Sequence, residues 1–289
     1  MIPTWFFFTL FSVFGLVAAE LSQRVSMKKV EDISAEANNF IVWLIISSVG
    51  LITSLLTGQL DFSPINLNYL LYFAAIGVIY FWGGTLFYSS YKGLSAAVGM
   101  TLVTFSAIVS TTIGVLFLNE GFSISKIFGI GMIIFAIFLV NYNKEFKLNK
   151  FALLALGGAG LYGIAYSIDK ALVLQLNPYT YLFLFALSIA VTSLIFRPKK
   201  IINDLTKKAK LGNYKVMLLA GLSFSIFNLF TFRAYSAGGH VGVIDAINNT
   251  SVFGILLIEY FFFNERKNIL KKIIAAMIAV LALMMIVLV

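Results

Sequence analysis

The sequence has no cysteine, one histidine and four prolines, and charged residues make up only 11% of it. Without cysteine there is no disulfide and no thiolate metal site, and one histidine is too few for a histidine metal site. We therefore expect no metal and no cofactor. Soluble domains carry about 25% charged residues. The low charge content excludes a soluble enzyme, a disordered chain and a nucleic-acid binder that relies on surface charge.

The motifs of common catalytic sites are also missing. The sequence contains no HExxH, no P-loop and no Gly-x-Ser-x-Gly. It predicts a protein that is not an enzyme and that has no nucleotide-driven motor of its own. One alternative of a different class stays open, a membrane enzyme acting on a lipid-linked substrate with Asp169, Asp245 or Glu20 as acid or base.

Apolar residues are abundant, at 60% of the chain. A membrane-spanning helix needs about 20 mostly apolar residues. Ten segments meet this requirement, at 4–24, 39–57, 69–91, 95–118, 124–142, 151–174, 178–196, 215–235, 241–263 and 269–288. Because backbone groups in lipid must pair within a helix or a closed barrel, we expect an all-α integral membrane protein with ten transmembrane helices. Residues 2–19 imitate a signal peptide, but no basic residue precedes them, so we expect a retained first span.

The basic residues alternate with the predicted spans. Ten spans place 18 of the 21 lysines and arginines in loops on one side of the membrane and leave Lys126, Lys170 and Arg233 on the other. The basic side includes the longest polar stretch, residues 197–215. Since cytoplasmic loops are rich in basic residues, the charges place that side in the cytoplasm and both termini outside.

The sequence also repeats itself weakly. A shift of 145 residues gives twelve identities between positions 87 and 133, including Asn119/Asn264 and Glu120/Glu265. We expect two five-helix halves, residues 1–145 and 146–289, in a single membrane-embedded body. An odd number of spans inserts the two halves in opposite directions, and such inverted repeats are a transporter architecture. Coincidence of composition is the alternative.

Short motifs resemble a known family. Leu118-Asn119-Glu120, followed by Gly129 and Ile133, is similar to the loop-and-helix signature of EamA-type members of the drug/metabolite transporter superfamily, and Ser95-Ala96-Ala97 fits it too. The resemblance implies the ten-span, five-plus-five plan and a cavity formed mainly by spans one, three, four, six, eight and nine.

The sequence departs from this family in three places. Ile274 stands where the second half would carry glycine, and Ala107 and Val252 stand where the fourth and ninth spans often have proline. The resemblance also implies that both termini lie in the cytoplasm, against the charge distribution. The orientation of the termini therefore stays open.

The predicted ninth span offers the clearest substrate-binding residues. Asp245, Asn248 and Asn249 fall on one face at helical spacing. One carboxylate and two amides bind a polar solute by charge and hydrogen bonds. The alternative is that the amides tie helices together.

The predicted sixth span carries Tyr162, Tyr166, Asp169 and Lys170 along one face. Arg233 and Asp245 are expected at a similar depth. Two acids and two bases at one level predict an ion-pair cluster that gates one mouth of a cavity, with His240 at the same mouth. The alternatives are a static ion pair and long side chains that reach the interface.

Four further residues complete the candidate set. Thr101 and Thr104 in the fourth span and Asn228 in the eighth are candidates to line the cavity. Glu20 is the only acid of the first span, and its position resembles that of the acid in the first helix of small multidrug-resistance transporters. That resemblance implies proton exchange at Glu20, whereas a local pair with Arg24 is the alternative.

Together these features predict a secondary active transporter in the cell membrane. It would move a small organic metabolite or drug-like solute by alternating access around a midplane cavity, with export as the favoured direction and proton coupling through Glu20. Its expected partners are the small-molecule substrate and membrane lipids, with no nucleic acid, and the sequence is compatible with a homo-oligomer. The substrate itself is not encoded in any motif.

Orientation can be tested at Asn203, which lies in the polar stretch 197–215. In intact cells, a single cysteine at this position, Asn203→Cys, should resist thiol reagents that do not cross membranes, because the charge distribution places it in the cytoplasm. Lysis should then make it reactive. Ready labelling from outside would reverse the topology.

Overall fold

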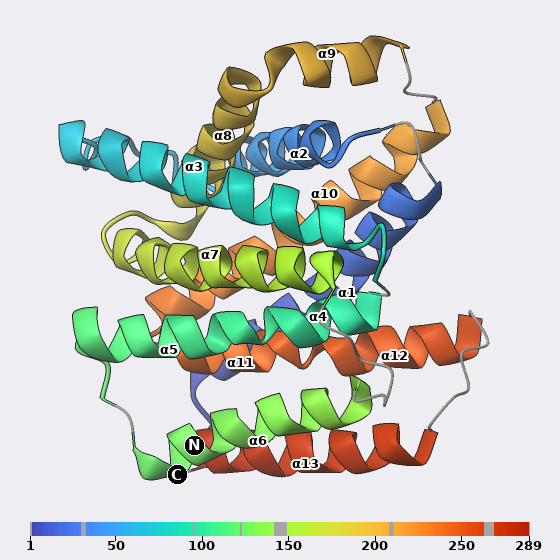
Figure 1. Ribbon diagram of the computed structural model, residues 1–289. Coiled ribbons are helices and arrows are strands. Elements are labelled where there is room, and N and C mark those ends of the chain that lie inside the picture. Colours follow the sequence, from blue (N-terminus) through green and yellow to red (C-terminus); the bar gives the residue numbers. More distant parts are fainter. Residues whose placement is uncertain are drawn as a thin grey trace.

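The computed structural model describes residues 2–29, 33–94, 96–121, 123–141, 149–207, 211–262 and 269–288, and it contains helices and no strand within these ranges. The helices are α1 (Thr4–Lys29), α2 (Ala35–Leu56), α3 (Leu67–Ser90), α4 (Ala96–Val103), α5 (Phe105–Phe117), α6 (Ile124–Asn141), α7 (Lys150–Val173), α8 (Pro178–Phe196), α9 (Pro198–Lys207), α10 (Leu211–Ser236), α11 (Val241–Asn249), α12 (Ser251–Phe262) and α13 (Ile269–Leu288). Figure 1 shows most of them running in roughly the same direction across the molecule.

Asparagine side chains begin several of the helices. The Asn66 side chain accepts hydrogen bonds from the backbone N–H groups of Asn68 and Tyr69 at the start of α3. Asn149 and Asn177 do the same for α7 and α8, and Pro178 occupies the first turn of α8. These caps satisfy backbone donors that have no partner within the helix, which matters most near lipid.

Seven helices in the described ranges are long and apolar enough to cross a membrane. The predicted spans at 95–118, 124–142 and 269–288 are not among them. The first of these is divided into α4 and α5 at Thr104, and the predicted ninth span is likewise divided into α11 and α12 at Thr250. The all-helical class is confirmed, and the count of ten spans stays a prediction.

Helices far apart in the sequence form the main packed pairs. Helix α1 packs on α10, α2 on α8, α3 on α7 and α6 on α13. In the view of Figure 1, the beginning of α1 and the end of α13 both lie toward the lower left of the molecule. Glycines allow the closest approaches: a Cβ at Gly50 of α2 would lie 2.6 Å from the backbone nitrogen of Phe183 in α8.

The polar stretch 197–215 is not a plain loop, because residues 198–207 form α9. Its Ile201 is buried against Ile33, Ala37 and Met217. The Lys200 ammonium lies 2.7 Å from a Glu36 carboxylate oxygen. The amphipathic pattern of α9 therefore docks it beside the start of α2, where Figure 1 shows it above the other helices.

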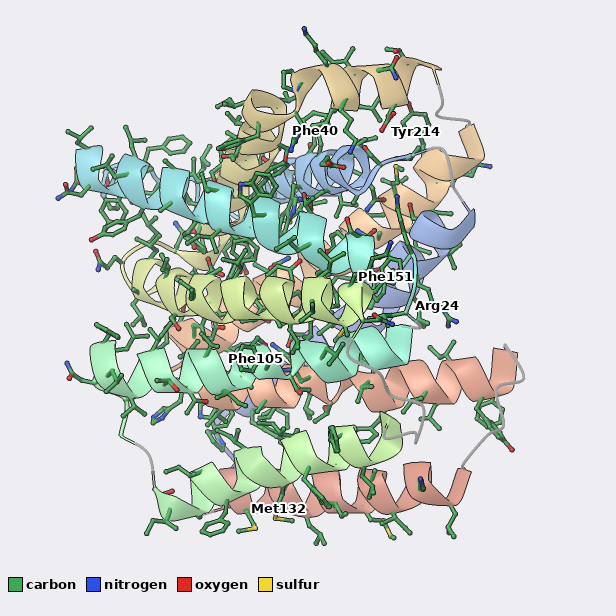
Figure 2. All side chains as sticks on the ribbon, viewed as in Figure 1. Arg24, Phe40, Phe105, Met132, Phe151 and Tyr214 are labelled. Atoms are coloured by element: carbon green, nitrogen blue, oxygen red, sulfur yellow. The ribbon has the colours of Figure 1, made fainter. Side chains whose placement is uncertain are left out.

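Large apolar side chains cover much of the outside. Leu56, Phe14 and Phe117 are more than 70% exposed, although water would disfavour this. Hydrocarbon is as apolar as these side chains, so their exposure suits a lipid-facing surface. Figure 2 shows side chains projecting outward along the helices and filling the spaces between them.

Candidate functional site

Asp245 is buried on α11 and is hydrogen-bonded mainly to α5. Its Oδ1 accepts from the Ser106 hydroxyl at 3.1 Å and from the Asn249 amide at 3.1 Å, and its Oδ2 accepts from the Ser110 hydroxyl at 2.9 Å. Ser106 and Ser110 are one helical turn apart and so present both hydroxyls to one carboxyl group. The carboxyl thereby joins the two predicted halves of the chain.

Asn248 does not share these partners. Its Oδ1 accepts from Ser12 of α1 at 2.5 Å, and its Nδ2 donates to Thr231 of α10 at 3.3 Å. The three residues of the predicted stripe thus have two sets of partners. Asp245 and Asn249 bond each other beside α5, whereas Asn248 links α11 to α1 and α10, as the alternative of amides that tie helices together predicts.

Asp169 is held by two tyrosines. Its Oδ1 accepts from the Tyr181 hydroxyl at 2.6 Å, and its Oδ2 accepts from the Tyr80 hydroxyl. The Tyr80 ring contacts Trp43 and Phe185 at centroid distances of 5.5 and 4.9 Å. Asp169 is thus a fully buried carboxyl group at the edge of an aromatic cluster that joins α2, α3, α7 and α8.

Lys170, the next residue, points to different partners. Its ammonium group forms a buried salt bridge with Glu120 and donates to the Gly239 carbonyl at 2.8 Å. The Glu120 carboxylate also accepts from the backbone N–H of Val241, at 3.0 and 3.1 Å, and so sits at the positive end of α11. The Lys170–Glu120 pair joins the α5–α6 connection to α7 and to the start of α11.

Arg233 has other partners than that pair, and His240 lies between the two residues whose backbone groups bind the pair. The Arg233 guanidinium lies 4.7 Å from the centre of the Phe8 ring and donates to the Tyr179 hydroxyl at 3.1 Å. His240 occupies the position that precedes the first turn of α11. The predicted ion-pair cluster of Asp169, Lys170, Arg233 and Asp245 is wrong, because spacing along each helix does not reveal which neighbouring helix supplies the partner.

The other predicted residues also lie in the interior. Glu20 is buried and accepts from the Tyr91 hydroxyl at 2.5 Å. Tyr162 and Tyr166 are stacked with their ring centres 6.0 Å apart, and the Tyr80 ring lies 5.8 and 6.3 Å from them. Asn228 is buried and donates to the Phe224 carbonyl of its own helix at 2.8 Å.

Two threonines were predicted to line the cavity as well. Thr104 is buried where α4 gives way to α5, so it marks a break in the helix. The side chain of Thr101 lies outside the part that the structure describes.

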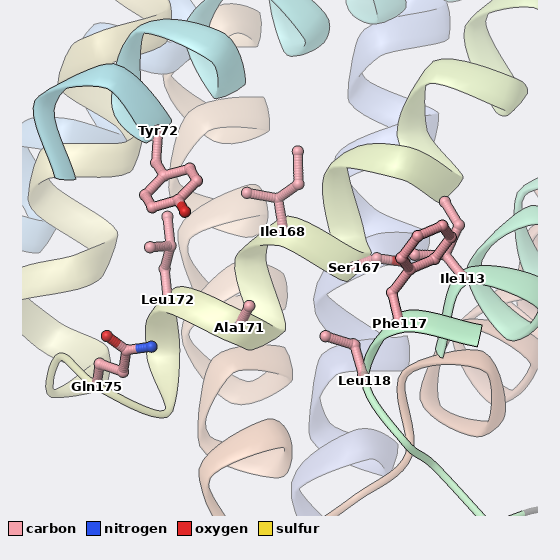
Figure 3. Close-up of a pocket in the computed structure, with 9 residues that line it drawn as sticks. All are labelled: Tyr72, Ile113, Phe117, Leu118, Ser167, Ile168, Ala171, Leu172 and Gln175. Carbon is pink, nitrogen blue, oxygen red and sulfur yellow. The ribbon is translucent and has the colours of Figure 1, made fainter. Parts of the chain in front are cut away.

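A shallow groove of about 230 Å³ opens between α3, α5 and α7 (Figure 3). Its lining is mostly apolar, with Tyr72 and Gln175 toward one end, and the remaining lining residues are Ile113, Phe117, Leu118, Ser167, Ile168, Ala171 and Leu172. None of the predicted site residues lines this groove. We therefore place the candidate site in the buried carboxyl groups and their partners.

Sequence reasoning missed several of these partners. Tyr80, Tyr181 and Ser106 were not among the candidate site residues, and Glu120 entered only through the internal repeat and a family motif. Each contacts a residue at least 12 positions away, and no local pattern predicts such a contact.

Comparisons with known proteins give one family match and one similar structure. The sequence model of the EamA-like transporter family matches residues 4–142. A protein of known crystal structure aligns over 96% of both chains, with 12% sequence identity and a TM-score of 0.71, which shows a shared fold. No curated protein sequence matches the chain.

The buried Lys170–Glu120 pair generates a stability prediction. Glu120→Gln leaves the Lys170 charge buried without its counter-ion, and we expect a loss of about 3–5 kcal/mol in the free energy of unfolding. Adding Lys170→Met should recover most of that loss. Thermal or denaturant unfolding of the purified protein measures both.

The Lys200–Glu36 pair provides the matched control. The Lys200 side chain is 51% exposed, so Lys200→Met should cost less than about 1 kcal/mol. Equal losses for Glu120→Gln and Lys200→Met would contradict a structural role for the buried pair.

Proposed function

We propose that the protein is a secondary active transporter of a small organic solute and a member of the drug/metabolite transporter superfamily, because residues 4–142 match the sequence model of the EamA-like transporter family. It resides in the cell membrane and exports its substrate by alternating access. Substrate and membrane lipids are its partners in this proposal.

The observation that carries the proposal is the match between the helix bounds of the two halves. Adding 145 to the bounds of α1 gives 149–174, and α7 spans Lys150–Val173. Adding 145 to the bounds of α4 and α5 gives 241–248 and 250–262, and α11 and α12 span Val241–Asn249 and Ser251–Phe262. Even the interruption at Thr104 thus recurs, one residue later in register, at Thr250.

The packing of the helices shows the same correspondence between the two halves. Helix α1 packs on α10, and its counterpart α7 packs on α3, which is the counterpart of α10. Two halves with five crossings each would be inserted in opposite directions, so this correspondence supports an inverted repeat. Rocking of one such half against the other is the usual basis of alternating access.

The Lys170–Glu120 pair would close one mouth of this transporter. Glu120 comes from the first half, whereas Lys170 and Val241 come from the second. The halves cannot separate at this end while the salt bridge and the helix-end contact persist. Opening must therefore break them or replace them with contacts to the solute or to water.

The alternative membrane enzyme is not favoured. Asp169, Asp245 and Glu20 each have a separate set of hydrogen-bond partners, on tyrosines or serines of different helices. An acid–base pair acting on one bond requires groups that converge on it, and these three carboxyl groups do not share a partner.

The function is tested by solute counterflow in proteoliposomes, with a panel of amino acids, nucleosides and cationic dyes. Asp245→Asn keeps the size of the side chain but removes its charge and replaces one of the two acceptor oxygens that Ser106, Ser110 and Asn249 share with an NH2 donor. We expect about tenfold lower transport, with normal membrane insertion. Asn248→Leu, which breaks only the contact between helices, serves as the comparison. If Asp245→Asn transports as well as the unchanged protein, Asp245 is not part of the transport site.

Proton coupling is tested at Glu20, because a buried carboxyl group with a single tyrosine partner can release and take up a proton. Glu20→Gln cannot do so, and it keeps the shape of the side chain. We expect loss of accumulation driven by a pH gradient while solute exchange without a gradient persists. Full pH-driven accumulation by this variant would remove Glu20 from the coupling mechanism.

A further inference from the structure

Helix α9 and its flanking residues carry a large share of the positive charge of the chain. Seven of the 21 basic residues lie at 197–215, together with one acidic residue. That acidic residue, Asp204, is only 3% exposed, and its carboxylate accepts from the Ser34 backbone N–H at 3.1 Å. The Glu36 carboxylate beside α9 is already paired with Lys200. The positive charge is therefore the charge that this part of the molecule presents outward.

Three exposed side chains, those of Arg197, Lys199 and Lys215, form what we name the basic surface. The Arg197 guanidinium, just beyond the end of α8, lies 5.8 Å from the centre of the Trp82 ring of α3. Lys199 is on α9. Lys215 is on α10 next to Tyr214, whose hydroxyl donates to the Leu205 carbonyl of α9 at 3.1 Å. Three consecutive helices thus contribute cations to one part of the surface.

Exposed apolar side chains border the basic surface. Ile195, two residues before Arg197, is 70% exposed, and Leu219, one turn after Lys215, is 56% exposed. Ile202 of α9 itself is 56% exposed. Cations and apolar side chains therefore adjoin, as the headgroups and the acyl chains of lipids do at the edge of a bilayer.

The position of α9 also suits a membrane surface. Helices α8 and α2 are both long and apolar enough to cross a membrane. Helix α9 begins two residues after the end of α8 and packs on the start of α2, at the outer edge of the molecule (Figure 1). A short amphipathic helix that follows a membrane span in this way lies where hydrocarbon gives way to headgroups.

We propose that the basic surface is a docking site for anionic phospholipids. Arg197, Lys199 and Lys215 bind the headgroup phosphates, and the acyl chains of the same lipids cover Ile195 and Leu219. Basic segments next to a membrane span attract anionic lipids in this way. An acidic protein or a nucleic acid would match the charges but would leave the apolar side chains uncovered. The proposal does not depend on the transport function.

Trp82 reports on the site, because Arg197 lies over its ring. The full chain, with Trp5→Phe so that only Trp82 and the buried Trp43 remain, is reconstituted in phosphatidylcholine bilayers. A fixed small fraction of the lipid carries brominated acyl chains, which quench tryptophan fluorescence on contact. This lipid is phosphatidylglycerol in one set and phosphatidylcholine in the other. We expect stronger quenching by brominated phosphatidylglycerol, and the difference should shrink as salt is added.

Paired variants then locate the site. Arg197→Gln with Lys199→Gln removes two charges from the basic surface, and it should lower the relative affinity for phosphatidylglycerol about tenfold. Lys92→Gln with Lys150→Gln is the matched control. It removes two exposed charges from other loops that are predicted on the same side of the membrane, and it should leave the preference unchanged. Lys199→Gln with Lys215→Gln should also lower the affinity, with Arg197 and its contact to the reporter intact.

Three outcomes would overturn the proposal. The first is equal quenching by the two brominated lipids. The second is an equal loss of preference in the Lys92 and Lys150 control, which would show a diffuse effect of charge instead of a site at α9. The third is loss of the preference when soluble glycerol phosphate is added at an ionic strength at which sodium chloride has no effect. That result would assign the basic surface to a soluble anion.

Discussion

A polar side chain inside a membrane has no water to bind, so its partner must come from another part of the protein. This constraint orders the interior of the molecule. Asp245 takes its partners from α5 and from its own helix, Asp169 takes them from α3 and α8, and Glu20 takes its partner from the end of α3. Each carboxyl group thereby becomes a specific link between helices whose apolar faces could otherwise slide past one another.

The same constraint separates what is fixed from what can move. Lys170 and Glu120 satisfy each other and also use the Gly239 carbonyl and the Val241 N–H group. Any opening at this end must therefore replace all of these contacts together. In contrast, the Gln23 Nε2, Asn39 Nδ2 and Thr85 hydroxyl groups have no hydrogen-bond partner among the described residues.

The all-helical fold was predictable because hydrophobic runs of about 20 residues are a direct consequence of membrane thickness. The link from Asp245 to Asn249 was also within reach, since residues four apart share a helix face. The break at Thr104 was not, because the mostly apolar segment around Thr104 has no proline or charged residue to mark it. Helix α9 was not predicted, because the many charged residues of 197–215 suggested a loop and hid the helical spacing of its apolar residues. Partners between helices, such as Tyr181 for Asp169, depend on packing that no spacing reveals.

The two halves match in the bounds of their helices but differ in the acidic residues buried inside those helices. A shift of 145 residues sets Asp169 against Arg24, Asp245 against Met100 and Glu20 against Ala165. In alternating access by an inverted repeat, each half takes up the conformation of the other. The inward-facing and outward-facing states would then be alike in backbone shape yet different in energy. Such a carrier has a built-in preference for one side of the membrane even when no gradient acts on it. The free energy of the empty carrier then rises on one of the two conformational steps of the cycle and falls on the other. Binding of the solute or coupling ion must supply the difference at the step that leaves the favoured state.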